Sequence, residues 1–282
     1  MSNPLDLFLA EVSENSSNEA VSSIVAPSTS SSSTEVQVDI DAYNYLVVCG
    51  CVDFDNMTSK AAAGLDVPHI IPLPKSVSKC WTSSSSSHFF IVLHTGEILA
   101  MGKNSNGQLS LGDQETRNSP TLIKFDGSFP VKKIATGRSH TLLLDADGDI
   151  YAAGSNQFGQ LGLGENGKSS KASTDHLSFK KVTFLTASAK DIGCGYEFSA
   201  AVTTEGKLYT WGHPEYGQLG HGSTGEFFKE GKAGMSHSCV YRPQLVNKFI
   251  NKGRDGRGAV TEYSAGPLLI STHRPTVEPI EY

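Results

Sequence analysis

The sequence has little of what membrane-spanning and secreted proteins contain. No apolar run approaches the roughly 18–20 residues that a membrane span needs. The first ten residues carry no basic side chain beside their short Leu/Phe patch, so we expect no secretory signal. Lysine and arginine are absent from residues 1–59, which hold nine acidic side chains. Since the net charge of the 282 residues is −6, residues 60–282 carry only +3, too little to argue for nucleic-acid binding.

Cysteine is also scarce, and its pattern excludes the usual frameworks. The five cysteines are an odd number and include no Cys-x-x-Cys pair; they are Cys49, Cys51, Cys80, Cys194 and Cys239. We interpret them as reduced thiols of an intracellular protein rather than as a disulfide or zinc framework. The nine histidines are scattered without metal-ligand spacing, so we expect no metal site and no cofactor.

The sequence does contain three copies of one repeated unit. Each copy has a short strand-like stretch that starts and ends with glycine and is followed by Gly-Gln-Leu. The copies start at Gly96, Gly148 and Gly206, which are 52 and 58 residues apart. Such a period indicates one supersecondary unit repeated along the chain, each unit burying its apolar face on the next.

The residues within a copy predict strands. In the second copy, the apolar run Thr141–Leu144 reaches a turn at Asp147-Gly148, and Asp149–Ala153 returns as the other arm of a hairpin. Lys132–Thr136 precedes this hairpin as another strand, and Ser119–Phe125 supplies a fourth strand between copies. Four short antiparallel strands in about 50 residues are a propeller blade. The fold class is therefore all-β, a β-propeller of four-stranded antiparallel blades.

The Gly-Gln-Leu residues are interpreted as structural. The glycine permits a tight reversal, the leucine fills the space between blades, and the glutamine hydrogen-bonds loop carbonyls that would otherwise be buried unpaired. His140 is interpreted as a residue that fixes a loop, and Asp145 and Asp147 as turn formers. The residues assigned these repeat roles are Gly107, Gln108, Leu109, Gly159, Gln160, Leu161, Gly217, Gln218, Leu219, His140 and Trp211.

Composition divides the chain into three parts. Residues 1–38 are an acidic, Ser-rich tail that we expect to be disordered, because it cannot bury enough apolar surface. Residues 39–250 form a partial β-propeller. Residues 251–282 are a non-repeat tail that we expect to be poorly ordered.

The start of the propeller part is degenerate. Asn44–Gly50 reads as its first strand, but no Gly-Gln-Leu follows. Pro68, Pro72 and Pro74 then predict a loop, since proline cannot lie in a central strand.

At its repeat residues the chain resembles the regulator-of-chromosome-condensation repeat family. That family's hallmarks are matched by Gly193-Cys-Gly195, by Trp211-Gly212 with Gly217–Gly220, and by Ala135–Thr141 with His140. The resemblance covers roughly residues 41–250. The family builds seven-bladed propellers. Because the hallmark stops at residue 222, we expect about three full blades and a partial one here.

The resemblance extends to one type within the family, although some residues differ from the family's pattern. Three segments are similar to the chromosome-condensation regulator two type. They are Pro214-Glu-Tyr216 inside its glycine-rich loop, Gly225–Phe228 after that loop, and Tyr43–Asp53. In the first copy, however, Met101 and Ser110 stand where the family prefers tryptophan and glycine. The strand before that copy is interrupted by five serines, 83–87.

The resemblance implies an interaction protein rather than an enzyme. It implies contact with small Ras-like GTPases, sometimes promoting guanine-nucleotide exchange without covalent catalysis, and association with chromatin, centromeres or the microtubules of the mitotic spindle. Localisation would be nuclear and cytoplasmic. No small-molecule substrate is expected. The residues that we expect to make the contact are Pro214, Glu215, Tyr216, Phe227, Phe228 and Lys229.

Alternatives remain open from the residues alone. The insertion that holds Phe227 and Phe228 could instead be a packed connection between blades. The protein could be a propeller scaffold without exchange activity. Residues 162–169 match GxxxxGKS, in which Lys168 and Ser169 would bind phosphate and Mg²⁺, but the flanking residues predict neither the buried parallel strand nor the helix of a P-loop.

Overall fold

The computed structural model describes residues 44–50, 65–73, 75–125, 127, 130–164, 175–185, 187–228, 235–247, 258–265 and 269–275. The predicted tail of residues 1–38 lies outside this part. The described residues form three four-stranded and three two-stranded antiparallel sheets.

The four-stranded sheets are three complete blades, which confirms the predicted fold class. In each blade the strands pair in chain order, so that the first strand lies at one edge and the fourth at the other. Blade one contains β3 (Val77–Trp81), β4 (His88–Leu93), β5 (Ile98–Gly102) and β6 (Arg117–Leu122). Blade two contains β7 (Lys133–Thr136), β8 (His140–Leu144), β9 (Ile150–Gly154) and β10 (His176–Lys181). Blade three contains β11 (Ala189–Cys194), β12 (Phe198–Thr203), β13 (Leu208–Gly212) and β16 (Val240–Leu245).

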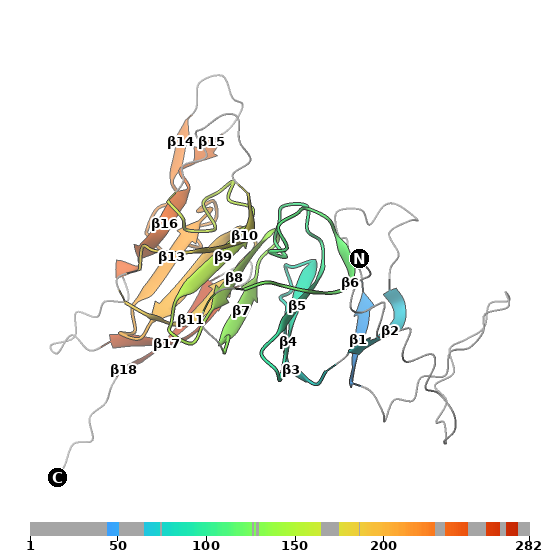
Figure 1. Cartoon of the computed structure of the whole chain (residues 1–282). Helices are drawn as coiled ribbons and strands as arrows, with labels where there is room; N and C mark the ends of the chain where they lie inside the picture. The colour runs from blue at the N-terminus through green and yellow to red at the C-terminus, as the bar shows by residue number, and fades with distance from the viewer. Residues whose placement is uncertain are drawn as a thin grey trace, which may run out of the picture.

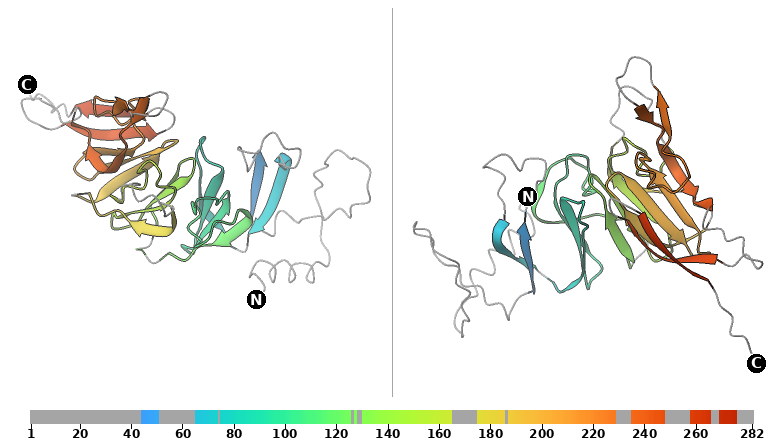
Figure 2. Two further views of the ribbon diagram at one scale, coloured as in Figure 1. Left: turned by 90° about the horizontal axis from the view of Figure 1, so that it is seen from above. Right: turned by 180° about the vertical axis from the view of Figure 1, so that it is seen from behind.

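Three two-stranded sheets accompany the blades. They pair β1 (Asn44–Gly50) with β2 (Leu65–Leu73), β14 (Glu226–Phe228) with β15 (Met235–His237), and β17 (Gly258–Ala265) with β18 (Leu269–Pro275). β1 and β2 lie at one end of the row of blades and β17 and β18 at the other, while β14 and β15 project beyond blade three (Figures 1 and 2). Two strands therefore lie in residues 251–282, where the sequence showed no repeat hallmark.

One expectation about β2 is wrong. Pro68 and Pro72 lie within this strand, not in a loop. β2 pairs with β1 alone among the described strands, so a residue without an N–H group is tolerated at its other edge. Pro74 lies outside the described residues.

Apolar side chains between the blades form the core. Between blades one and two, Phe90 and Leu109 pack with Ile134 and Leu143, and all four are buried. Blades two and three meet through a second cluster of buried side chains, in which Leu144, Leu161, Ile192 and Trp211 take part. The leucine of each Gly-Gln-Leu is fully buried, as expected for a residue that fills the space between blades.

A polar contact crosses each of these apolar interfaces. His88 Nε2 lies 2.8 Å from Thr141 Oγ1 of the next blade, and this hydroxyl donates to the Gln108 carbonyl, also over 2.8 Å. His140 Nε2 lies 3.0 Å from Ser199 Oγ of the next blade, which donates to the Gln160 carbonyl over 2.7 Å. We call this His–hydroxyl–carbonyl chain the inter-blade link.

The hydroxyl group determines the direction of the hydrogen bond between histidine and hydroxyl in each link. Since Thr141 and Ser199 each use their one proton on a carbonyl, the histidine Nε2 must donate to the hydroxyl. Burial also keeps both histidines neutral near pH 7, because it disfavours the charged form. Burial lowers the pKa of His88 to about 3 and that of His140 to about 4. Blade three has Phe198 at the equivalent position, opposite Gly212 as His140 is opposite Gly154.

The repeat glycines at the end of each third strand allow the chain to pass close to the second strand. Gly154 has φ +105°, and a Cβ atom there would lie 2.4 Å from the Ser139 carbonyl oxygen and 2.8 Å from His140 Cα. Gly102 and Gly212 show the same approach at φ +111° and +112°. Glycine is required here by conformation and by space together.

Ser110 shows how one departure from the repeat is accommodated. It has φ 60° and is the one non-glycine residue with positive φ within the described ranges. Gly162 and Gly220 occupy the equivalent position at φ +71°. The Ser110 hydroxyl accepts a 2.8 Å hydrogen bond from the Phe179 backbone N–H, an interaction that glycine could not make.

The glycine analysis predicts a difference between two alanine substitutions. Gly154→Ala and Gly112→Ala both place a side chain at positive φ, which costs about 1–2 kcal/mol. Only Gly154→Ala also forces Cβ against backbone, since a Cβ at Gly112 would have nothing within 4 Å. We expect urea unfolding to show a loss of more than about 3 kcal/mol for Gly154→Ala and the smaller loss for Gly112→Ala. Equal losses would contradict the close-approach argument.

The inter-blade links predict sensitivity to acid. The folded-state pKa values of His88 and His140 lie below the unfolded value of 6.5, so stability is fully present above pH 6.5 and falls as the pH drops toward 4. Each histidine should cost on the order of 1–2 kcal/mol between pH 6.5 and 5. His140→Phe, which copies Phe198 of blade three, should flatten this dependence in thermal unfolding measured across pH. Superimposable curves for the two proteins would disprove the role of His140.

Candidate interaction site

The candidate site lies on the face of the array where each first strand connects to a second and each third to a fourth. On this face Arg138 lies between β7 and β8, Tyr196 and Glu197 lie between β11 and β12, and Pro214–Tyr216 follows β13. The short turns of the hairpins, such as that between β8 and β9, lie on the opposite face. We call the first of these the loop face.

The Pro214–Tyr216 loop is anchored at one end and exposed at its tip. Pro214 is buried, and its carbonyl accepts a 2.8 Å hydrogen bond from the Gly217 N–H. Gln218 holds the loop from inside: its Oε1 accepts from the Tyr216 N–H at 2.7 Å, and its Nε2 donates to the His213 carbonyl at 2.6 Å. The Tyr216 side chain is 75% exposed, the highest value among the exposed large hydrophobic residues that the structure describes. An aromatic side chain is thus presented to solvent by a fixed backbone.

Pro214 replaces a residue that has a different role in the other copies. Asn104 and Asn156 occupy its position, and their Oδ1 atoms accept hydrogen bonds from the Leu109 and Leu161 N–H groups, at 2.9 and 3.1 Å. Proline offers no such acceptor. The loop of blade three is therefore built differently at the point where its tyrosine is exposed.

A second exposed tyrosine lies beside a charged pair. Arg138 of blade two places its guanidinium carbon 4.7 Å from the Tyr196 ring centroid. The backbone N–H of Arg138 donates to the Tyr196 carbonyl at 3.1 Å. Arg138 Nη1 lies 3.6 Å from Glu197 Oε1. Tyr196 is 45% exposed. Because the arginine and the tyrosine come from neighbouring blades, this contact spans the boundary between them.

His213 connects this pair to the tyrosine loop. Its Nδ1 lies 4.0 Å from Glu197 Oε2 and 3.5 Å from Glu215 Oε2, and its ring packs on Phe158 with centroids 4.4 Å apart. Burial raises the pKa of Glu197, and Glu215 raises it further while Arg138 opposes the rise. Burial lowers the pKa of His213. We define the rim cluster as Arg138, Tyr196, Glu197, His213 and Tyr216.

The predicted phenylalanines lie next to this cluster in the chain. Phe227 and Phe228 belong to β14, opposite Ser236 and Met235 of β15. At the base of this hairpin, a Cβ on Gly225 would lie 3.3 Å from Pro214 Cγ, so the hairpin and the tyrosine loop meet there. β14 and β15 form a sheet of their own and are not a strand of blade three. Lys229 lies outside the described residues.

The repeat glutamines accept hydrogen bonds from loop N–H groups, a role that the sequence did not predict. Gln108 Oε1 accepts from the Asn106 N–H and Gln160 Oε1 from the Phe158 N–H, both at 2.9 Å. Gln218 also has the expected contact with a loop carbonyl, since its Nε2 donates to the His213 carbonyl. The backbone carbonyls of Gln108 and Gln160 accept hydrogen bonds from the next blade. Trp211 Nε1 also donates to the Gln160 carbonyl, at 2.9 Å.

The GxxxxGKS match has no phosphate cradle in its described part. The Gly162 N–H donates to the Gly159 carbonyl at 2.9 Å, and the Gly164 N–H donates to the Tyr241 carbonyl at 2.8 Å. A Cβ on Gly162 would lie 2.7 Å from Trp211 Nε1, so blade packing explains that glycine. Lys168 and Ser169 lie outside the described residues.

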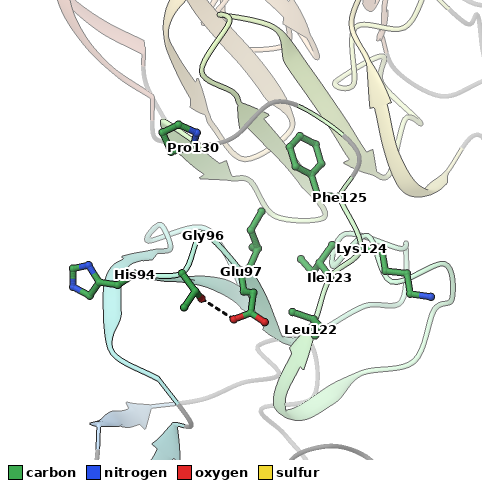
Figure 3. Close-up of a pocket in the computed structure, with 10 residues that line it drawn as sticks. His94, Gly96, Glu97, Leu122, Ile123, Lys124, Phe125 and Pro130 are labelled. Atoms are coloured by element: carbon green, nitrogen blue, oxygen red, sulfur yellow. Dashed lines mark hydrogen bonds between the residues drawn. The ribbon is translucent and has the colours of Figure 1, made fainter.

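A shallow pocket lies on the opposite face, between the β4–β5 turn and the connection to blade two (Figure 3). Its carboxylate, Glu97, accepts from Lys75 and from Thr95, each over 2.6 Å, and these bonds lower the pKa of Glu97. The wall formed by Phe125 contacts Tyr151 edge-on, with centroids 5.0 Å apart. The carboxylate and the aromatic ring of this pocket are therefore engaged within the protein, and the rim cluster is the stronger candidate.

The part of the chain that the structure describes offers neither a metal-ligand cluster nor a membrane-spanning helix. No three His, Cys, Asp or Glu side chains in that part come together as a metal site. No described helix has the length and apolar character of a membrane span.

Comparison with known proteins identifies the repeat. The model of the "Regulator of chromosome condensation (RCC1) repeat" matches residues 95–144, 147–202 and 205–266. These matches cover more than half of the chain, which therefore belongs to the RCC1 repeat family. Within it the chain is RCC2-like: it is 36% identical over 173 residues to the "Protein RCC2 homolog" of Danio rerio and 34% identical over 177 residues to "Protein RCC2" of Homo sapiens. These alignments cover 61% and 62% of this chain and 33% and 32% of the relatives, so the chain spans about a third of their length.

A solved structure agrees with the fold. Prp20p of Saccharomyces cerevisiae superposes with a TM-score of 0.60 at 18% identity, covering 76% of this chain and 48% of that one. At this identity the likeness shows the fold alone.

Of the rim cluster, sequence reasoning missed Arg138, Tyr196, Glu197 and His213. Arg138 follows Gly137 and Tyr196 follows Gly195, so the two side chains occupy equivalent loop positions in successive copies. The signal that could have found them is variation at an exposed position of an otherwise constant repeat.

Proposed function

We propose that this chain is an interaction protein that binds a small Ras-like GTPase through its loop face, with Tyr216 as the main anchor. The observation that carries the proposal is the 75% exposure of a tyrosine on a loop whose base, Pro214, is buried and whose backbone Gln218 holds. Membership of the RCC1 repeat family implies the class of partner. Prp20p, which shares the fold, was described for its binding to Gsp1p and histones.

The composition of the rim cluster suits a protein partner. Tyrosine and arginine are enriched among the residues that dominate binding energy at interfaces. Tyrosine loses little conformational entropy when it becomes buried, and a loop that is already ordered has little to lose in binding. Glu197 and Arg138 form a pair that a partner can cover without leaving one charge uncompensated.

Exchange activity would need no covalent chemistry. The tyrosine loop would bind the nucleotide-free GTPase more tightly than the nucleotide-bound form, and would thereby lower the affinity for guanine nucleotide. We propose that Pro214–Tyr216 makes this contact, together with Phe227 and Phe228 of the adjacent hairpin. A role in mitosis at chromosomes, centromeres or spindle microtubules, with nuclear and cytoplasmic localisation, follows from the family in the same way.

A scaffold without exchange activity is the second candidate. The observation that favours it is the number of complete blades: the described residues form three, where the family has seven. An exchange reaction that depends on several loops of a complete ring would be lost, whereas binding through the rim cluster would remain.

Binding should depend on the exposed tyrosine. Tyr216→Ala should weaken binding to a cognate GTPase by about 10- to 100-fold, because a central aromatic anchor contributes about 1.4–3 kcal/mol. Calorimetry against a panel of purified small GTPases would measure this. Leu122→Ala is the matched control. Leu122 is also a large apolar residue and is 51% exposed, but it ends β6 of blade one, on the side opposite the loop face. An equal effect of the two substitutions, or no binding to any GTPase, would overturn the proposal.

Exchange and scaffold functions are separated by one assay. Release of a fluorescent guanine nucleotide from the bound GTPase should accelerate at micromolar concentrations of this protein, and Tyr216→Ala should remove the acceleration. Binding without acceleration would favour the scaffold.

A further inference from the structure

The contact between blades two and three shows how the loop face holds a cation. The Arg138 guanidinium carbon lies 4.7 Å from the Tyr196 ring centroid, and Arg138 Nη1 lies 3.6 Å from Oε1 of Glu197, the residue after this tyrosine. One guanidinium is therefore attracted both by the face of a tyrosine ring and by the carboxylate next to it. The arginine comes from one blade, and the tyrosine and glutamate come from the next.

The tyrosine loop carries the same two residue types without such an arginine. Glu215 and Tyr216 are adjacent in sequence; the Glu215 side chain is 39% exposed, and Tyr216 is 75% exposed. No lysine or arginine among the described residues forms an ion pair with Glu215 or lies over the Tyr216 ring. The group that faces the Glu215 carboxylate is His213, whose Nδ1 lies 3.5 Å from Glu215 Oε2.

His213 does not neutralise this carboxylate near pH 7. Burial lowers the pKa of His213; Glu215 acts to raise it and His237 to lower it. The titratable groups that face its ring are Glu197 at 4.0 Å, Glu215, and His237 of β15, whose ring centroid is 5.7 Å away. Phe158, from the loop of blade two, packs on the ring and is uncharged. Glu215 therefore faces a neutral imidazole near pH 7.

The charge of the loop face also favours a basic partner. In the described parts of the connections between first and second and between third and fourth strands, acidic side chains outnumber basic ones. The acidic residues are Asp113, Glu115, Asp175, Glu197, Glu215 and Glu226, and the basic residues are Lys103 and Arg138. Complementary charge steers a partner toward a surface and suppresses partners of like charge.

We propose that the partner on the loop face supplies an arginine side chain that binds Glu215 and Tyr216 as Arg138 binds Glu197 and Tyr196. The class of partner, a small GTPase, rests on the proposed function, whereas the chemistry of the contact does not. Arginine suits this site better than lysine, because its planar guanidinium stacks on a ring while its N–H groups reach a carboxylate. Tyr216 then binds a cation beside Glu215 and is more than an apolar anchor.

The arrangement makes this contact sensitive to acid. When His213 gains a proton, its charged ring pairs with the Glu215 carboxylate and competes with the incoming arginine. Since the pKa of His213 is lowered from its ordinary value of 6.5, the affinity for arginine is full above pH 6.5 and falls as the pH drops below it. Burial raises the pKa of Glu197, so its protonation weakens the contact in the same direction.

The experiment titrates the purified full chain with ethylguanidinium, which carries the cation of arginine without its backbone. With isotope-labelled tyrosine rings, NMR should show a saturable shift of the Tyr216 signal, which Tyr216→Phe assigns. Glu215→Gln should weaken binding about 2- to 5-fold, the range of a partly exposed ion pair. Glu115→Gln is the matched control, because it removes a carboxylate from the loop face of another blade. The signal of Tyr45, which is 43% exposed between Asn44 and Leu46, should not shift.

Repeating the titration from about pH 7.5 to about pH 5 tests the role of His213. The chain should lose affinity for the probe as the pH falls, and His213→Gln should reduce that loss. His94→Gln, an exposed histidine on the opposite face, should leave the loss unchanged. Far-UV circular dichroism checks that each variant is folded.

The outcomes separate this contact from the proposed function. The contact is rejected if the Tyr216 signal shifts no more than that of Tyr45, or if Glu215→Gln and Glu115→Gln have equal effects. Binding of the probe at Tyr216 without binding of any GTPase would support the contact and reject the class of partner. A GTPase whose affinity falls with Tyr216→Ala but not with Glu215→Gln would support the proposed function and reject the arginine contact.

Discussion

The blade array depends on the backbone carbonyl of the glutamine in the Gly-Gln-Leu of blades one and two. The Gln160 carbonyl is enclosed between blades, where an unpaired acceptor would cost about 1–3 kcal/mol. Ser199 and Trp211 of blade three both donate to it. The loop of one blade can therefore keep its conformation only when the next blade is in place, and the next blade is positioned by that same loop.

This dependence also explains where the candidate site lies. The loops of the loop face are held from both sides, so the residues at their tips can vary without loss of the backbone shape. Arg138 and Tyr196 use this freedom at equivalent positions of neighbouring blades, and their contact marks the boundary between the blades. At Pro214 the variation extends to the loop interior, where the asparagine acceptor of the other copies is absent and Gln218 Nε2 donates to the His213 carbonyl.

The sequence predicted what repetition and local chemistry determine. The four-stranded blades, the buried leucines and the need for glycine followed from spacing and conformation. The inter-blade links did not follow, because His140 and Ser199 are 59 residues apart and their contact depends on how blades stack. The acceptor role of Gln108 and Gln160 was also missed, although their donors, the Asn106 and Phe158 N–H groups, lie only two residues away. Pro68 and Pro72 misled because proline excludes a central strand but not an edge strand, and the sequence alone did not reveal which edge β2 occupies.

The phase of the strands has a consequence for how such chains change length. The repeat matched at residues 147–202 contains the third and fourth strands of blade two, β9 and β10, and the first and second strands of blade three, β11 and β12. The unit of duplication therefore straddles two sheets. A unit inserted into the array would be joined to both of its neighbours by hydrogen bonds within a sheet, and not by side-chain packing alone.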